Sequence, residues 1–221
     1  MLSGKFIDLS HRLIPGKEEY HLRLKSVNTS DRYAQYIVED GFWYILQDIE
    51  MSSHCGTHIE FPYHHNKSGL DAAGFGLDRL ITPCVLLDFR HKKPNEAVTR
   101  ADVEEYDGLI LPGDSVLLNF GVTMYYRTDN SHVRPYLDLE AVKWLADVKK
   151  INLIGSDASG IEIKGVPNQP VHQYLMEHQI PIIEFANNLN AISKSRFTIF
   201  VLALAVEGLD SCPVRLVAYE E

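Results

Sequence analysis

The sequence is poor in cysteine and lacks a long apolar run. Its 221 residues include three cysteines, at positions 55, 84 and 212, which are too few and too scattered for a disulfide framework. The longest apolar run, residues 197–206, falls well short of the roughly 20 residues that a membrane-spanning helix needs and suits a buried strand. The opening residues also lack the apolar core of a signal peptide. From these absences we expect a soluble, cytoplasmic protein.

An excess of positive charge is missing as well. The chain has 21 Lys and Arg against 30 Asp and Glu, and its formal net charge is -9. Proteins that bind nucleic acid through phosphate contacts need a basic surface, so we expect neither nucleic acid nor a membrane as the partner. Hydrophobic residues make up 45% and charged residues 23%, which is ordinary for a globular protein. We expect residues 1–221 to form a single domain.

The distribution of apolar residues predicts a mixed α/β protein. The clearest helix is predicted at residues 139–148 with Asp138 as its cap, and a shorter helix is predicted after the cap Thr99. The dipeptide Asp40-Gly41 favours a tight hairpin turn. A further helix is predicted at residues 171–178, and strands are predicted at residues 5–10, 20–25, 33–38, 42–49, 81–89, 115–120, 151–154, 180–185, 197–206 and 214–219.

The most informative stretch is residues 53–65, SHCGTHIEFPYHH, which holds four of the ten histidines. His54, His58, Glu60 and His64 share the same parity, so in an extended backbone their side chains would lie on one face. Imidazole nitrogen and carboxylate oxygen suit zinc, manganese and similar ions, and an open site of this kind can activate water for attack on a carbonyl. The alternative is a chance cluster of surface histidines. We expect the preceding strand to run directly into this stretch.

A second pair of candidate ligands lies far downstream. Glu184 ends a strand that is predicted to be buried, and a buried carboxylate needs a partner such as a metal ion. His172 precedes it by twelve residues. Each residue also has an ordinary explanation when taken alone, His172 as a helix cap and Glu184 as a surface carboxylate.

Several segments together resemble the cyclase-like metal-dependent hydrolases, a family that includes bacterial kynurenine formamidase and isatin hydrolase. The family signature His-x-Gly-Thr-His-x-Asp-x-Pro-x-His is similar to residues 54–64. The other similar segments are G-S-D-A-S at 155–159, the pair His172 and Glu184, and D-S-C-P-V-R at 210–215. The resemblance covers essentially the whole chain. It implies a compact α/β domain with a mixed, barrel-like β-sheet core and peripheral helices.

The resemblance also implies the roles of the site residues. The implied metal ligands, with the two carboxylates shared between two ions, are His54, His58, Glu60, His172 and Glu184. His64 is the implied catalytic histidine, which would carry a proton from water to the leaving nitrogen. The implied reaction is hydrolysis of an amide, formamide, cyclic amide or lactone bond by metal-activated water. The implied cofactor is Zn2+, two per chain, or Mn2+, and the implied assembly is a homodimer or homotetramer acting on a small molecule.

Two positions depart from the family pattern. Glu60 stands where the family has aspartate, and its extra methylene displaces the carboxylate by about 1 Å, a shift that matters for catalysis. A carboxylate that reaches both metals, one that binds a single metal and a mononuclear site all stay open. Residues 16–32 contain no tryptophan, whereas kynurenine formamidases carry one there for the aryl substrate. This argues against kynurenine formamidase activity itself and leaves the hydrolase chemistry intact.

Two alternative functions use the same residues differently. Cys55 lies among imidazoles that would activate a thiol, but in an extended strand it points away from His54 and His58, which favours a small buried residue. Serine hydrolysis is disfavoured because no G-x-S-x-G elbow occurs. The second alternative is a metal-stabilised, non-catalytic binding protein of the same fold, which the replacement of aspartate by Glu60 allows.

Overall fold

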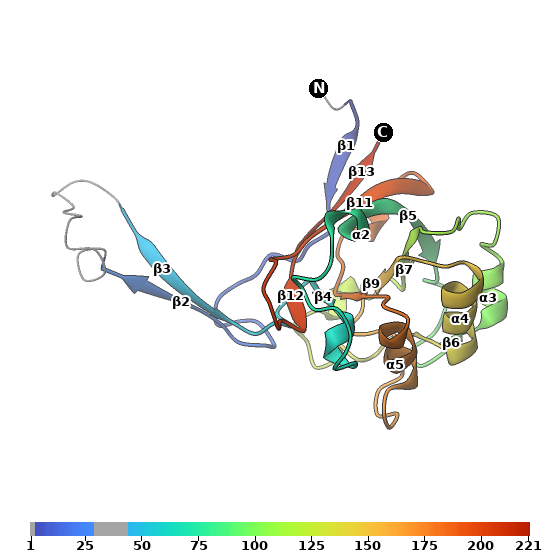
Figure 1. Cartoon of the computed structure of the whole chain (residues 1–221), viewed down its shortest axis with the longest axis horizontal. Helices are drawn as coiled ribbons and strands as arrows, with labels where there is room; N and C mark the ends of the chain where they lie inside the picture. Colours follow the sequence, from blue (N-terminus) through green and yellow to red (C-terminus); the bar gives the residue numbers. More distant parts are fainter. Residues whose placement is uncertain (1–2, 29–43) are drawn as a thin grey trace.

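The computed structural model describes residues 3–28 and 44–221. Within these ranges one sheet of nine strands dominates, with the order β1-β13-β11-β5-β7-β9-β10-β4-β12 (Figure 1). Its strands are β1 (Lys5–Asp8), β4 (His58–Glu60), β5 (Ile81–Asp88), β7 (Ser115–Asn119), β9 (Leu153–Ser156), β10 (Ile182–Glu184), β11 (Arg196–Leu202), β12 (Ser211–Pro213) and β13 (Arg215–Glu220).

The middle of this sheet is parallel and both of its ends are antiparallel. Strands β5, β7, β9 and β10 run parallel to one another. Strands β11, β13 and β1 extend one end, and β4 and β12 extend the other. The sheet is curled into a half-barrel, with short helices beside it (Figure 1). The predicted α/β fold with a mixed, barrel-like sheet and peripheral helices is confirmed.

The helices are short and begin at recognisable caps. Thr99 forms a capping box with Asp102, and the Asp138 carboxylate accepts a hydrogen bond from the backbone of Ala141, so both predicted caps are confirmed. The helices are α2 (Leu77–Leu80), α3 (Arg100–Glu104), α4 (Leu139–Lys143) and α5 (Pro170–Glu177), with a π-helical turn η3 (Trp144–Val148) and 3-10 turns η1 (Pro62–His64), η2 (Thr123–Tyr125) and η4 (Leu189–Ala191). In the described ranges no helix combines the length and apolar character that crossing a bilayer requires.

Apolar side chains fill both faces of the central strands. In β7, Val116 and Leu118 belong to the core that includes residues of α3, α4 and α5, whereas Leu117 belongs to a second core on the opposite face. Side chains alternate along a strand, so a strand that is covered on both faces has a continuous apolar sequence. This burial explains the apolar runs from which the strands at 81–89 and 115–120 were predicted.

A two-stranded antiparallel ribbon projects away from the large sheet (Figure 1). It consists of β2 (Leu22–Val27) and β3 (Leu46–Met51), and we call it the arm. The predicted turn at Asp40-Gly41 and the predicted strand at 33–38 lie outside the described residues. A third sheet consists of two parallel strands, β6 (Ala97–Val98) and β8 (Tyr136–Leu137).

The strand predicted before the histidine stretch, β3, does lead into it, but it lies in a different sheet from β4. Strand β3 ends at Met51 and pairs with β2, and residues 52–57 form turns and bends before β4 begins in a different sheet. Gly56 lies in this segment with φ +69°, and a Cβ there would lie 2.2 Å from Leu13 Cδ2. The chain turns here because glycine permits both the left-handed conformation and the close packing.

Candidate metal centre

Strand β4 places His58 and Glu60 on one face of the sheet, with Ile59 between them in the core on the other face. All three residues are buried, so a shift by one residue would bring an apolar side chain into the site, and the register is strongly specified. The pairing of β4 with β10 places His58 opposite Glu184. The histidine stretch and the downstream carboxylate therefore meet through strand pairing.

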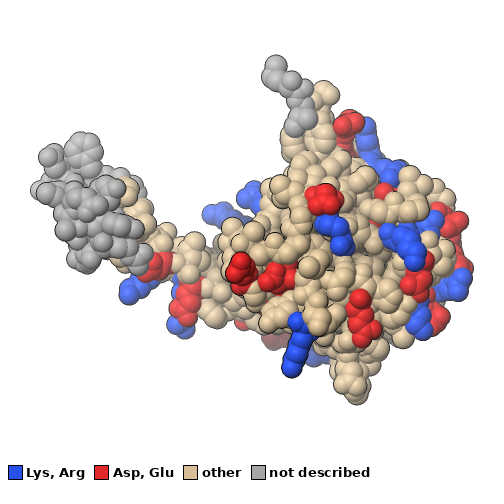
Figure 2. Space-filling view, in the orientation of Figure 1, with Lys and Arg blue, Asp and Glu red and all other residues tan. Residues whose placement is uncertain are grey.

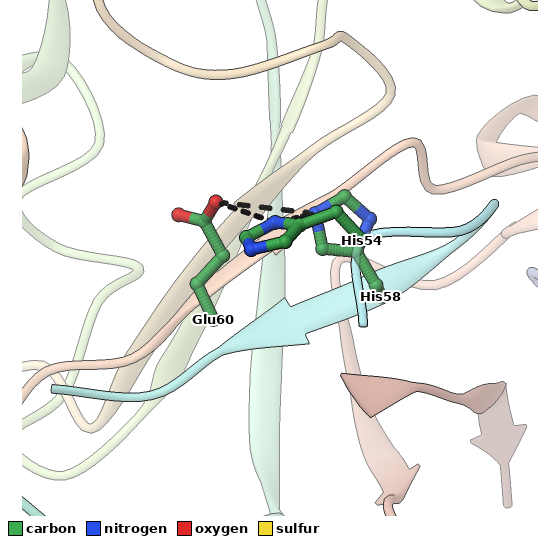
Figure 3. Close-up of side chains that lie close together, drawn as sticks. All are labelled: His54, His58 and Glu60. Carbon is green, nitrogen blue, oxygen red and sulfur yellow. Dashed lines mark hydrogen bonds and ion pairs between the residues drawn. The ribbon is translucent and has the colours of Figure 1, made fainter. Parts of the chain in front are cut away.

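His54, His58 and Glu60 point toward one another although they do not lie on one extended strand (Figure 3). His54 Nδ1 lies 3.2 Å from Glu60 Oε1 and 3.3 Å from His58 Nε2. His58 Nδ1 donates to the carbonyl of Gly56 (2.8 Å), which leaves Nε2 directed at the cluster. The turn at residues 52–57 thus brings His54 back over β4, and the expectation of a single extended stretch is corrected.

The other oxygen of Glu60 faces a second group of side chains. His172, in the first turn of α5, has its Nε2 3.8 Å from Glu60 Oε2 and 3.8 Å from Glu184 Oε1. Glu184 Oε2 lies 3.7 Å from His58 Nε2. Each carboxylate therefore faces His58 with one oxygen and His172 with the other, and the five side chains predicted as ligands lie in one cluster.

His64 lies at the edge of this cluster, at the end of η1. Its Nε2 is 3.7 Å from Glu60 Oε1, and its Nδ1 is 2.8 Å from Asp210 Oδ2. The same Asp210 oxygen is 3.1 Å from His54 Nε2, so one carboxylate oxygen accepts from both imidazoles. Asp210 begins the D-S-C-P-V-R segment at 210–215, but its contacts are not predictable from that motif because it is 146 residues away from His64. His65 stacks on His172 with ring centroids 5.4 Å apart.

Glu162 is a second residue that sequence reasoning missed. Its carboxylate accepts hydrogen bonds from His172 Nδ1 (2.8 Å) and from the backbone N–H groups of Val171 (2.9 Å) and His172 (3.3 Å). It therefore satisfies free donors at the start of α5 and fixes the orientation of the His172 ring. No motif pointed to Glu162, because its partner groups come together only when α5 forms.

The residue after Glu184 has an unfavourable backbone conformation. Phe185 has φ 52°, a left-handed conformation that costs about 1 kcal/mol or more for a residue other than glycine. Its N–H donates to the carbonyl of Ala158 (2.9 Å), and its carbonyl accepts from Thr57 Oγ1 (2.6 Å). Thr57 thereby ties the turn that carries His54 to the end of the strand that carries Glu184.

Cys55 takes no part in this cluster. It is fully buried, and burial, with a contribution from the nearby Glu18, raises the pKa of its thiol to about 11. A thiol with such a pKa is almost entirely protonated at neutral pH and is a poor nucleophile. The structure therefore agrees with the expectation of a small buried residue and disfavours the thiol enzyme.

The electrostatics of the cluster favour bound positive charge. Burial lowers the pKa of His54, but hydrogen bonds to Glu60 and a neighbouring carboxylate outweigh it and raise the pKa to about 9. Burial likewise lowers the pKa of His172, whereas the carboxylates around it raise it to about 10. Burial raises the pKa of Glu60, but the surrounding imidazoles outweigh this effect and lower the pKa to about 2. The Glu60 carboxylate is thus ionised at neutral pH and holds cations against it.

The donor atoms fit a divalent metal ion. In a tetrahedral zinc site with bonds of about 2.1 Å, ligand atoms lie about 3.4 Å apart, close to the distances around His54 Nδ1. Glu60 Oε2 is buried without a hydrogen-bond partner among the described residues, which is rare unless another group binds the atom. Three groups have ligand atoms within 4.8 Å of one another: His54, His58 and Glu60; His54, His64 and Asp210; and Glu60, His172 and Glu184.

Comparison with known proteins agrees with this chemistry. The profile of the Cyclase family matches residues 7–163. Kynurenine formamidase of Erythrobacter litoralis is 28% identical over 172 residues, which cover 78% of this chain and 76% of that protein. Kynurenine formamidase of Bacillus anthracis is 25% identical over 169 residues, which cover 76% and 77%.

Two solved structures share the fold. A protein described as a potential metal-dependent hydrolase with cyclase activity has a TM-score of 0.74 and 26% identity, with 99% of each chain covered. An isatin hydrolase bound to the product analogue thioisatinate has a TM-score of 0.84, with 98% of this chain and 92% of that chain covered. Its identity is 17%, so this second likeness concerns the fold alone.

Metal binding is expected to release protons and to strengthen as the pH rises. At pH 7 the raised pKa values keep His54 and His172 protonated in the metal-free chain, whereas a metal ligand must be neutral imidazole. Calorimetric titration of the chelator-treated chain with Zn2+, in buffers of different ionisation enthalpy, measures the proton release. The apparent affinity should increase from pH 6 toward pH 9. Binding that releases no proton and does not depend on pH would contradict these protonation states.

Proposed function

Because the chain belongs to the Cyclase family, we propose that it is a metal-dependent hydrolase that cleaves an amide, formamide, cyclic amide or lactone bond with metal-activated water. The observation that carries this proposal is the buried cluster in which Glu60 and Glu184 each face His58 and His172. The matching kynurenine formamidases support hydrolysis of a C–N bond, and the similar metal-dependent hydrolase supports the use of a metal ion.

We assign the donors to two ions. His54 and His58 would hold one ion and His172 the other, with the carboxylates of Glu60 and Glu184 shared between them. The longer side chain of Glu60 supports this arrangement, because its two oxygens face the two groups at 3.2 Å and 3.8 Å. Zinc suits these nitrogen and oxygen donors best, and manganese is the second choice. When bound, such ions polarise a carbonyl oxygen and make a water molecule more acidic.

His64 carries the proton in this proposal. Its Nδ1–H donates to Asp210, so Nε2 has a free lone pair on the side that faces Glu60. From this position Nε2 accepts the proton of the attacking water and donates it to the leaving nitrogen or oxygen. Asp210 keeps the ring in the required tautomer through both steps and stabilises it while it is protonated.

The cluster opens into a cavity with room for a small molecule. The cavity has a volume of about 360 Å³ and also extends past Tyr20, His132 and Gly160. The Tyr20 ring centroid lies 6.1 Å from that of His54, so the base of the arm forms one wall. These dimensions support a small-molecule substrate and leave its identity open within the class of amides and lactones.

We also propose that the chain assembles with copies of itself through the arm. Leu24 lies opposite Ile49 on one face of the ribbon, and these two residues are 44% and 67% exposed. On the other face the register places Arg23 opposite Glu50, so opposite charges face each other within the arm, and Figure 2 shows basic and acidic side chains next to each other along it. A lone two-stranded ribbon is marginally stable in water, and a second copy that covers the apolar face would stabilise it.

Substitutions at His64 and His58 should separate proton transfer from metal binding. H64Q is expected to retain the metal and to lose about a hundredfold or more in kcat, because general acid–base catalysis contributes at least that much. H58Q should lose metal and activity together. Metal content and kcat on a panel of formamides, cyclic amides and lactones are measured for both variants.

Two results would contradict these roles. If H64Q lost the metal, His64 would be a ligand together with His54 and Asp210, which also form a possible metal-binding group. If chelation lowered the melting temperature but the loaded chain turned over none of these substrates, the protein would be a metal-stabilised binding protein.

The arm is expected to determine the oligomeric state. I49K places a charge on the apolar face and should shift the assembly toward monomer in sedimentation experiments, because burying an unpaired charge is costly. K25Q, on the charged face of the same ribbon, is the control and should leave the sedimentation coefficient unchanged. A monomeric wild-type chain, or an unchanged assembly in I49K, would refute this mode of association.

A further inference from the structure

We propose that the substrate carries a carboxylate and that Arg134 receives it. This inference rests on the proposed hydrolase function and specifies the class of its substrate: an amide, formamide or cyclic amide with an anionic group beside the bond that is cleaved. It depends on three features of the cavity lining beside the metal-ligand cluster, namely the burial of Arg134, its unused hydrogen-bond donors and its position.

Arg134 is a buried cation with few partners. The residue is 6% exposed and lines the cavity. Its Nη1 donates to the carbonyl of Pro135 (3.3 Å) and its Nη2 to the carbonyl of Ser159 (3.1 Å), while its Nε has no partner among the described residues. A guanidinium has five N–H donors, so these contacts leave most of them free.

No carboxylate neutralises Arg134 in the described part of the chain. Every ion pair found there within 4.0 Å joins other residues. Glu184 and Glu162 are the two carboxylates whose charges act on Arg134, and both have other partners. Glu184 faces the imidazoles of the cluster, and Glu162 accepts hydrogen bonds from His172 and Val171. Buried arginine is normally paired, so the cavity contains a cation that lacks its anion.

The position of Arg134 relates it to the reacting bond. A Cβ on Gly160, which has φ +107°, would lie 2.8 Å from Arg134 Nη2 and 3.0 Å from Glu184 Oε1. The guanidinium and a proposed metal ligand thus approach the same point, and the absence of a side chain at Gly160 keeps the space beside it open. A substrate held by its carboxylate at Arg134 would place a neighbouring amide toward the cluster.

Lys164 adds a second positive charge on the same wall. The exposed Lys164 lines the cavity, as does the half-buried His132. Burial lowers the pKa of His132, and the positive charges of Lys164 and Arg134 lower it further, although Glu19 opposes them. Lys164 and Arg134 therefore act on the same part of the cavity and attract an anion to it.

A matched pair of probes tests this proposal. 2-Formamidobenzoate and 2-formamidobenzamide have nearly the same shape and differ in charge. The metal-loaded wild-type chain should favour the carboxylate in kcat/KM by about tenfold or more, the size expected for hydrogen bonds between charged groups. R134Q should lose this preference through a higher KM for the carboxylate, with little change for the carboxamide. R134K should keep part of the preference, and R100Q, which removes an exposed arginine on α3, should behave as wild type.

Calorimetric binding of the same two compounds to the metal-loaded chain gives a second readout that does not depend on turnover. Tighter binding of the carboxylate by wild type, and loss of this difference in R134Q, supports the proposal even if no substrate is hydrolysed, in which case the proposed hydrolase function alone fails. Equal affinity of wild type for both compounds, or a carboxylate preference that R134Q retains, overturns it. An equal loss for both compounds in R134Q, or a failure of that variant to fold with bound metal while R134K shows no preference, also overturns it.

Discussion

The buried carboxylate of Glu60 is the interaction on which the whole site depends. Removing an ionised carboxylate from water costs several kcal/mol unless positive charge compensates it, and here the compensation must come from the imidazoles or from the ions that they bind. One oxygen faces His54 and the other faces His172, so segments more than a hundred residues apart are held around one side chain. Asp210 and Glu162 then fix the rings of these two histidines, and the cluster keeps its geometry through partners behind it.

The fold divides the cavity into two walls with different tasks. Strand β4, between β10 and β12, carries the centre of the ligand cluster on a rigid part of the sheet, where small displacements are resisted. The other part of the lining comes from loops around Arg134 and Gly160, and Arg134 and Lys164 give it positive charge. Loops of this kind vary more readily than strands, so the substrate range can change while the chemistry stays with the sheet.

The residues of the site could be predicted from the sequence more fully than the path of the chain that brings them together. Apolar runs and caps located β5, β7, α3 and α4, because burial on both faces and cap chemistry leave strong local patterns. Strands β4 and β12 have three residues each, too few for a periodic pattern, and the extended path expected through the histidine stretch is broken by the turn before β4. The histidine motif at residues 54–64 and the pair His172 and Glu184 indicated the residues that the structure brings together. Asp210, Glu162 and Arg134 were missed as site residues because their contacts form only in the folded chain.

The central claim is that the cluster around Glu60 binds divalent metal ions, and the most direct test is elemental analysis of the untagged protein. With both carboxylates shared between two groups of ligands, about two zinc or manganese ions per chain are predicted. Glu60→Gln, which removes the charge at the centre with little change in shape, should lose both. A wild-type chain that contains no ion, even after incubation with zinc and with manganese, would contradict the claim.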